Sequence, residues 1–180
     1  MWLSPEQFFA FLAAAMLITV SPGSDNLMVL GVGIARGRAS GVAFGLGCGF
    51  GCLSHTLLAT LGVSALIAAS PLAFVLLKVG GGLYLVWLGV QALRSRGGVT
   101  MGSAQGADES LFRLFAKGLL ANAINPKVVL FFLSFLPQFV VAERGYVGWQ
   151  TLQLGLIFTA QAALLFGLLG YFSGAVGNWL

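Results

Sequence analysis

The sequence predicts an all-α integral membrane protein, folded as a bundle of membrane-spanning helices. Of its 180 residues, 58% are hydrophobic and 8% are charged, whereas a soluble domain carries roughly 25% charged residues. Its apolar stretches, several of them without any charge, exceed the about 20 residues that a helix needs to cross a bilayer. Two apolar stretches also contain an interior proline. Composition therefore excludes a water-soluble domain, and the prolines predict two broken helices inside the membrane.

Five spans fit the apolar stretches. We expect them at Phe8 to about Ala35, Ser40 to Ala69, Leu72 to Leu93, Phe112 to Val141 and Val147 to Phe172. The second span closes at Ser70-Pro71, because proline cannot continue the helix before it. The segment 96–110 is rich in glycine and serine, which is typical of a linker. It separates a first half, 1–95, with three spans from a second half, 111–180, with two.

Lys and Arg are distributed unevenly between the two sides of these spans. One side holds Arg36, Arg38, Arg94, Arg96, Arg113 and Lys117, and the other holds Lys78 and Arg144. Because cytoplasmic loops carry an excess of positive charge, we expect the linker 96–110 to be cytoplasmic and the N-terminus to lie outside. The charges lie singly or in pairs rather than in a basic patch, so no nucleic-acid partner is expected.

The two interior prolines correspond when the chain is shifted against itself by 104 positions. The shift places Pro22 on Pro126 and Ser21 on Asn125, so each proline follows a small polar residue. Three expected spans separate the two prolines, and an odd number inverts the second half relative to the first. Paired, interrupted segments in inverted halves are typical of the substrate site of a secondary transporter, near the middle of the membrane.

The chemistry of such a site follows from what a break does to the backbone. Proline has no N–H, so carbonyls on one side of the break and amides on the other lose their helical partners. At membrane depth these groups are tolerated only inside protein or beside a wet cavity. Asp25 beside one break suits an ammonium group or a proton, and Lys127 beside the other suits a carboxylate. Together they would complement a zwitterionic amino acid. The candidate substrate-binding or coupling residues are Asp25, Lys127, Pro22, Gly23, Asn26, Asn125 and Pro126.

Three of the polar residues also have structural interpretations. Asp25 could cap its own helix by accepting amide hydrogen bonds. Lys127 could reach the lipid headgroups if residues 111–124 formed an amphipathic helix in the cytoplasmic interface. His55, in the middle of the second span, could relay protons with Asp25, or it could simply form a hydrogen bond between helices.

The glycines and cysteines of the second span are interpreted as packing residues. The glycines are Gly41, Gly45, Gly47, Gly49 and Gly51. Their spacing lets another backbone approach closely, within the chain or in a homo-oligomer. Cys48 and Cys52 lie four apart on one helix face and do not have the spacing of a zinc or redox motif. The chain offers no paired carboxylates and no metal-ligand cluster, so we expect neither an enzyme nor a cofactor.

The motifs around the two breaks resemble those of a known family. They are Ser21-Pro22-Gly23-Ser24-Asp25-Asn26-Leu27, the Gly37-Arg38 and Gly41 pattern, Leu83-Tyr84-Leu85 with Leu88-Gly89, Asn122 with Asn125-Pro126-Lys127, Phe131-Phe132-Leu133 and Phe135-Leu136-Pro137-Gln138-Phe139. With these motifs the chain is similar, over essentially its whole length, to the lysine exporter and homoserine/threonine exporter (LysE/RhtB) family. The resemblance implies a multi-pass protein of the bacterial inner membrane that exports amino acids, driven by the proton gradient.

The chain departs from this family at two points. The family usually has proline where this chain has Ser24, which should relax the backbone slightly without removing the break. Family members also carry a sixth span, which the sequence printed here lacks. The alternative to an exporter is therefore a truncated, non-transporting remnant or an assembly subunit of such an exporter.

Overall fold

The computed structural model describes residues 2–70 and 109–177, together with positions 72, 75, 76, 79, 80, 82, 83, 86, 87 and 90; for residues 63–69 it describes the backbone alone. Every regular element among these residues is a helix. The span expected from Leu72 to Leu93 and the linker expected at 96–110 lie largely outside the described residues.

The helices follow the expected spans. They are α1 (Pro5–Val20), α2 (Ser24–Arg36), α3 (Arg38–Ala69), α5 (Leu111–Ala123), α6 (Pro126–Leu130), a π-helix at Phe131–Phe135, 3-10 helices at Leu136–Phe139 and Ala142–Arg144, and α7 (Val147–Gly177). The first expected span is thus α1 and α2, interrupted at Ser21–Gly23, and the fourth is α5 and α6, interrupted at Ile124–Asn125. Both interruptions lie where the prolines predict them.

Local signals explain where the helices begin. Ser4 and Gln7 form a reciprocal pair at the start of α1, in which each side chain accepts a hydrogen bond from the other residue's backbone amide, at 3.3 and 3.1 Å. This arrangement satisfies two amides that the first helical turn leaves free. Ser110 accepts in the same way from the Arg113 amide at the start of α5.

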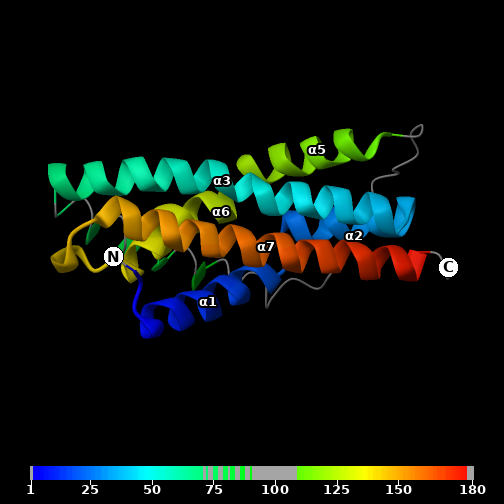
Figure 1. Ribbon diagram of the computed structural model, residues 1–180. Coiled ribbons are helices and arrows are strands. Elements are labelled where there is room, and N and C mark those ends of the chain that lie inside the picture. Colours follow the sequence, from blue (N-terminus) through cyan, green and yellow to red (C-terminus); the bar gives the residue numbers. More distant parts are fainter. Residues whose placement is uncertain are drawn as a thin grey trace.

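The helices lie roughly along one axis (Figure 1). The broken pair α1–α2 runs one way, α3 and the broken pair α5–α6 run back, and α7 runs the whole length of the molecule. The two broken pairs are therefore antiparallel, as inverted halves require. The inverted repeat itself stays a prediction.

The packing of α3 against α7 and α5 depends on glycine. A Cβ atom at Gly41 would lie 2.5 Å from the Gly170 carbonyl oxygen of α7, and one at Gly49 would collide with Ala163. Gly47 makes the same close approach to the backbone of Phe115 in α5. The packing interpretation of the glycines is therefore correct, and the glycine pattern is used between helices of the same chain.

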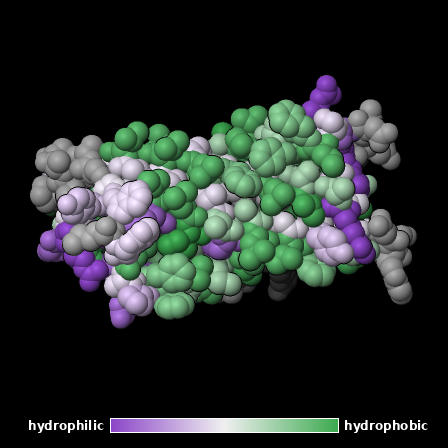
Figure 2. Space-filling model, viewed as in Figure 1, coloured by the Kyte–Doolittle hydropathy of each residue, from purple (hydrophilic) through white to green (hydrophobic). Residues whose placement is uncertain are grey.

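The described residues contain between two and four candidate membrane spans. Arg38–Gly62 and Val147–Gly177 are each long and apolar enough alone. The pairs α1 with α2, bent by 59°, and α5 with the segment Pro126–Phe139, bent by 50°, qualify together. The surface shows a broad hydrophobic band between two hydrophilic ends (Figure 2). This distribution fits a bilayer around the middle of the molecule. The count of five spans stays a prediction.

Some of the described charged residues form polar contacts at the two ends of the molecule. At one end Glu109 bridges Arg36 and Lys117, at 3.0 and 2.6 Å. The hydrogen bond from Lys117, reinforced by Arg36, lowers the pKa of Glu109. At the other end Arg144 donates to the Gln7 side chain at 2.7 Å. The Glu109 group therefore joins the end of α2 to α5, and we predict that it faces the cytoplasm.

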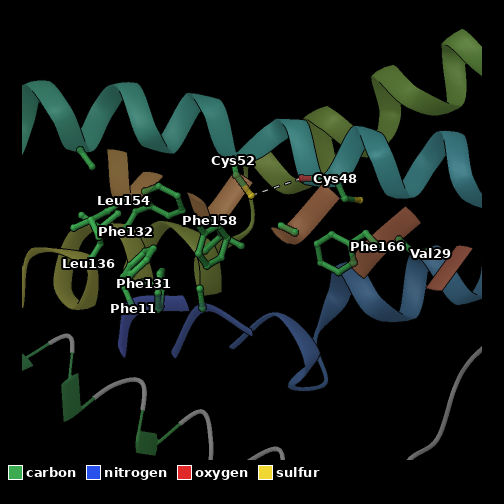
Figure 3. Packing of buried hydrophobic residues seen from close by; sticks show 14 of the residues in the cluster. Phe11, Val29, Cys48, Cys52, Phe131, Phe132, Leu136, Leu154, Phe158 and Phe166 are labelled. Atoms are coloured by element: carbon green, nitrogen blue, oxygen red, sulfur yellow. Dashed lines mark hydrogen bonds between the residues drawn. The ribbon is translucent and has the colours of Figure 1, made fainter. Parts of the chain in front are cut away.

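Aromatic side chains fill the core between α1, the π-helix and α7 (Figure 3). Phe131 lies 4.9 Å from Phe158 and 6.1 Å from Phe11 between ring centroids. Phe11 also contacts Phe139, whose carbonyl accepts a hydrogen bond from Gln7 at the Arg144 end. The rings thus form a continuous apolar path from the middle of the molecule to that end.

Candidate functional site

The two helix breaks meet in the middle of the molecule. The Lys127 ammonium, at the start of α6, donates a hydrogen bond to the Ser21 carbonyl at the end of α1, at 2.6 Å. A Cβ atom at Gly23 would lie 3.3 Å from both Cδ and Nζ of Lys127, so glycine leaves room for the lysine beside the backbone. The cation of one break thus satisfies a carbonyl that the other break has freed.

A small cavity lies between the breaks. Its walls are Ile18, Thr19, Gly23, Asp25, Asn26, Asn122, Asn125, Lys127, Val128, Phe131, Phe158 and Phe166. Its volume is about 20 Å³, which is room for about one water molecule. Most of the predicted site residues therefore face a single space, but that space is too small for an amino acid in this conformation.

Asp25 supplies a buried carboxyl group to this cavity. The residue is 2% exposed, and its Oδ2 accepts a hydrogen bond from the Asn122 amide nitrogen at 2.7 Å. Within the described part of the chain, Oδ1 has no hydrogen-bond partner. Neither oxygen accepts from a backbone amide of α2 among the described residues, so the geometry does not fit the capping interpretation.

Asn122, in the last turn of α5, joins three elements. It is fully buried and donates to Asp25 of α2. Its side-chain oxygen accepts from the Cys52 thiol of α3 at 3.4 Å, and its backbone carbonyl lies 3.1 Å from Nε2 of His55. In the sequence, Asn122 stands out only as part of the motif that resembles the family. The signal available in the sequence is the position of this asparagine, one helical turn before Asn125-Pro126.

His55 lies between helices rather than against the carboxylate. A carbonyl oxygen only accepts hydrogen bonds, so Nε2 carries the hydrogen in the contact with Asn122. The imidazole also packs against the Phe132 ring, with centroids 5.6 Å apart. This geometry fits the interpretation as an interhelical hydrogen bond, and a relay role stays a prediction.

The remaining predicted residues shape the two breaks. Asn125 accepts from the Lys127 amide at 3.0 Å and caps α6, with Pro126 in the first helical position. Asn26 donates to the Thr19 carbonyl at 2.9 Å, across the break that Pro22 begins. These contacts stabilise the interruptions while Asn26 and Asn125 also line the cavity.

Thr19 and Gln161 form a polar contact that was not singled out from the sequence. Gln161 of α7 donates to the Thr19 hydroxyl at 2.9 Å, and both side chains are buried. The available signal was the presence of two polar residues inside otherwise apolar spans. Among the described residues, no group of three or more His, Cys, Asp or Glu side chains could hold a metal ion.

These features define a helical membrane protein with a charged site between two broken helices. The family model described as LysE type translocator matches residues 16–180. The chain therefore belongs to this family, the LysE/RhtB type of membrane amino-acid efflux transporters, whose members are not enzymes.

Three relatives illustrate the range of the match. The chain is 35% identical to an uncharacterized membrane protein of Vibrio cholerae, over 89% of this chain and 78% of that protein. It is 33% identical to a homoserine/homoserine lactone efflux protein of Salmonella typhimurium, over 77% and 67% of the two chains. It is 31% identical to a leucine efflux protein of an Enterobacter strain, over 93% and 79%. No solved structure matches the chain.

Proposed function

We propose that this protein exports a zwitterionic amino acid in exchange for protons, and that the substrate binds between Asp25 and Lys127. The observation that carries the proposal is the pairing of two unlike groups at one cavity: a buried carboxylate with an unpaired oxygen and an ammonium from the opposite break. The names of the leucine and homoserine efflux relatives support an amino acid as the substrate.

The two charged groups would act on opposite ends of the substrate. The substrate ammonium would donate to the free Oδ1 of Asp25. The substrate carboxylate would replace the Ser21 carbonyl as the acceptor for Lys127. A hydrogen bond between two charged groups is stronger than one to a neutral carbonyl, so a carboxylate would compete well for the lysine.

Proton exchange would use the same carboxylate. Asp25 would hold either a substrate ammonium or a proton, because both need the unpaired oxygen. Release of the substrate on the outer side would leave Asp25 free to take a proton, which it would carry inward. Exchange of one for the other is what couples efflux to the proton gradient in this proposal.

Access to the site requires the helices to separate. The cavity holds about one water molecule, so it must widen before any amino acid enters. Towards one end the aromatic rings beyond Phe131 fill the path, and at the other end Glu109 ties Arg36 to Lys117. Rearrangement at each end in turn would give alternating access.

We also propose that the protein lies in the bacterial inner membrane with the Glu109 end inside.

The test is efflux from proteoliposomes loaded with L-leucine or L-homoserine under an imposed pH gradient. We expect Asp25→Asn to abolish gradient-driven efflux, while Arg113→Ala, at an exposed cation outside the cavity, leaves most of it intact. Efflux at the wild-type rate in Asp25→Asn would contradict the proposed site. If wild-type protein transports neither amino acid nor any other zwitterion, the export function is wrong.

The non-transporting alternative is not favoured, since the residues of both breaks converge on one cavity. Self-association stays a prediction. The glycines of α3 do not support it, because they already pack against α7 and α5 of the same chain.

A further inference from the structure

We infer that Asn122 is a positioning residue that keeps Asp25 apart from Lys127, so that each charge remains available to a zwitterionic ligand. The inference rests on the proposed function and adds to it a specific residue and role. It is carried by the juxtaposition of a fully buried amide, a carboxylate with one free oxygen, and an ammonium at the same cavity.

The orientation of the Asn122 amide follows from its two partners. A carboxylate only accepts hydrogen bonds, so the amide nitrogen must face Asp25. The amide oxygen then faces the Cys52 thiol, which donates to it at 3.4 Å. Both ends of the amide are therefore occupied, and the side chain has one favourable orientation in this buried site.

The backbone around Asn122 is held as well. His55 donates to its carbonyl at 3.1 Å. Gly51 of α3 faces it so closely that a Cβ atom there would lie 2.8 Å from the Asn122 Cβ and from the Leu119 carbonyl oxygen. Contacts from two adjacent turns of α3, made by Gly51, Cys52 and His55, thus hold the residue that in turn positions Asp25.

This constraint has a consequence for the two charges. Asp25 and Lys127 line one cavity, yet the described ion pairs do not include them. Lys127 donates to the Ser21 carbonyl instead, while Asp25 accepts from Asn122. Without Asn122, the carboxylate would be free to turn towards the ammonium. An internal ion pair would then occupy the groups that the substrate needs.

The first experiment is a double-mutant cycle on the binding of radiolabelled L-leucine to the purified protein. We expect Asn122→Ala to weaken binding by about tenfold, in the range of one hydrogen bond to a charged group. Asp25→Asn should weaken binding more, and adding Asn122→Ala to it should change binding little further, because the position acts only through Asp25. Additive effects, or wild-type binding by Asn122→Ala, would overturn the inference.

A double variant separates positioning from folding. Exchanging the two residues, Asp25→Asn with Asn122→Asp, keeps the short amide–carboxylate contact and the shape of the site. At position 122, however, both carboxylate oxygens would be engaged, one by the amide at position 25 and one by Cys52. We expect this protein to fold but to bind L-leucine as weakly as Asp25→Asn. Restored binding would overturn the positioning role.

A matched glycine pair extends the test to the support from α3. Gly51→Ala should push Asn122 away and weaken leucine binding, whereas Gly62→Ala, in the same helix with open space around it, should not. Equal binding by the two glycine variants would contradict the inference. If Asp25→Asn itself binds and transports like the wild type, the proposed function fails, which is a different outcome from a failure of Asn122 alone.

Discussion

The two helix breaks differ in what satisfies their polar groups. The break at Ile124–Asn125 is closed by its own side chain, since Asn125 caps the first turn of α6. The break at Ser21–Gly23 ends in Gly23, which has no side chain to cap α2. Its Ser21 carbonyl accepts a hydrogen bond from Lys127 of the other break. The polar groups of one interruption are therefore satisfied by its own residues, and we call it the complete break. Those of the other, the incomplete break, depend on groups from elsewhere in the chain.

This difference indicates that the two breaks have different roles in binding a substrate. The incomplete break offers groups that a substrate can contact, namely Asp25 and the carbonyl of Ser21. The complete break holds Lys127 and Asn122 at the right places to engage them. If the Ser21 break were capped by its own side chain, its carbonyl would not need Lys127 as a donor.

After the loss of efflux in Asp25→Asn, the largest expected effect comes from removing the cation that joins the breaks. Lys127→Met keeps a long side chain but leaves the Ser21 carbonyl without its donor and removes the anion-binding group. We expect leucine efflux to fall by about 10- to 100-fold, the range of a hydrogen bond to a charged group. The measurement is the initial efflux rate in proteoliposomes. Arg113→Met, at an exposed cation of α5 outside the cavity, is the matched control, and equal losses in both variants would argue against a specific role at the break.

An intermediate effect is expected from opening the self-capped break. Asn125→Ala removes the cap of α6 and should lower the stability of the folded protein by about 1 kcal/mol. Thermal unfolding in detergent measures this loss. Asn125→Asp keeps an acceptor at the cap and should retain most of the stability. If alanine and aspartate destabilise equally, the cap is not what holds the second break.

The smallest effect is expected at the charged end, where the two broken spans are joined. The pKa of Glu109 is lowered from its ordinary value of 4.5 because Lys117 donates a hydrogen bond to it and Arg36 lies beside it. The stabilisation is present above the ordinary pKa and is lost as pH falls through the lowered one. Glu109→Gln should therefore unfold at a slightly lower temperature than the wild type at neutral pH, and the difference should vanish in strong acid. A difference independent of pH would mean that the ion pairs do not cause it.

The features predictable from the sequence were those encoded locally. Pro22 and Pro126 predicted the positions of both breaks, and the scarcity of charge drew attention to Asp25 and Lys127. The spacing of the glycines predicted close helix packing, which the contacts of α3 confirm. Each of these signals lies within a few residues of the structure it describes.

The missed features depend on distant parts of the chain. Asn122 is 70 residues from Cys52 and 97 from Asp25, and Gln161 is 142 from Thr19. A single sequence does not say which helix faces meet, so the partners of a buried amide could not be assigned. The same reason explains why capping remained an alternative for Asp25, since its actual partner comes from the other half of the chain.

Ligand discrimination tests most directly the claim that Asp25 and Lys127 recognise opposite ends of an amino acid. Binding of L-leucine would be compared with leucinamide, which lacks the carboxylate, and with 4-methylpentanoate, which lacks the ammonium. Wild-type protein should prefer leucine to both. Lys127→Met should lose the preference over leucinamide alone, and Asp25→Asn should lose the preference over 4-methylpentanoate alone. Wild-type discrimination in both variants would contradict the account.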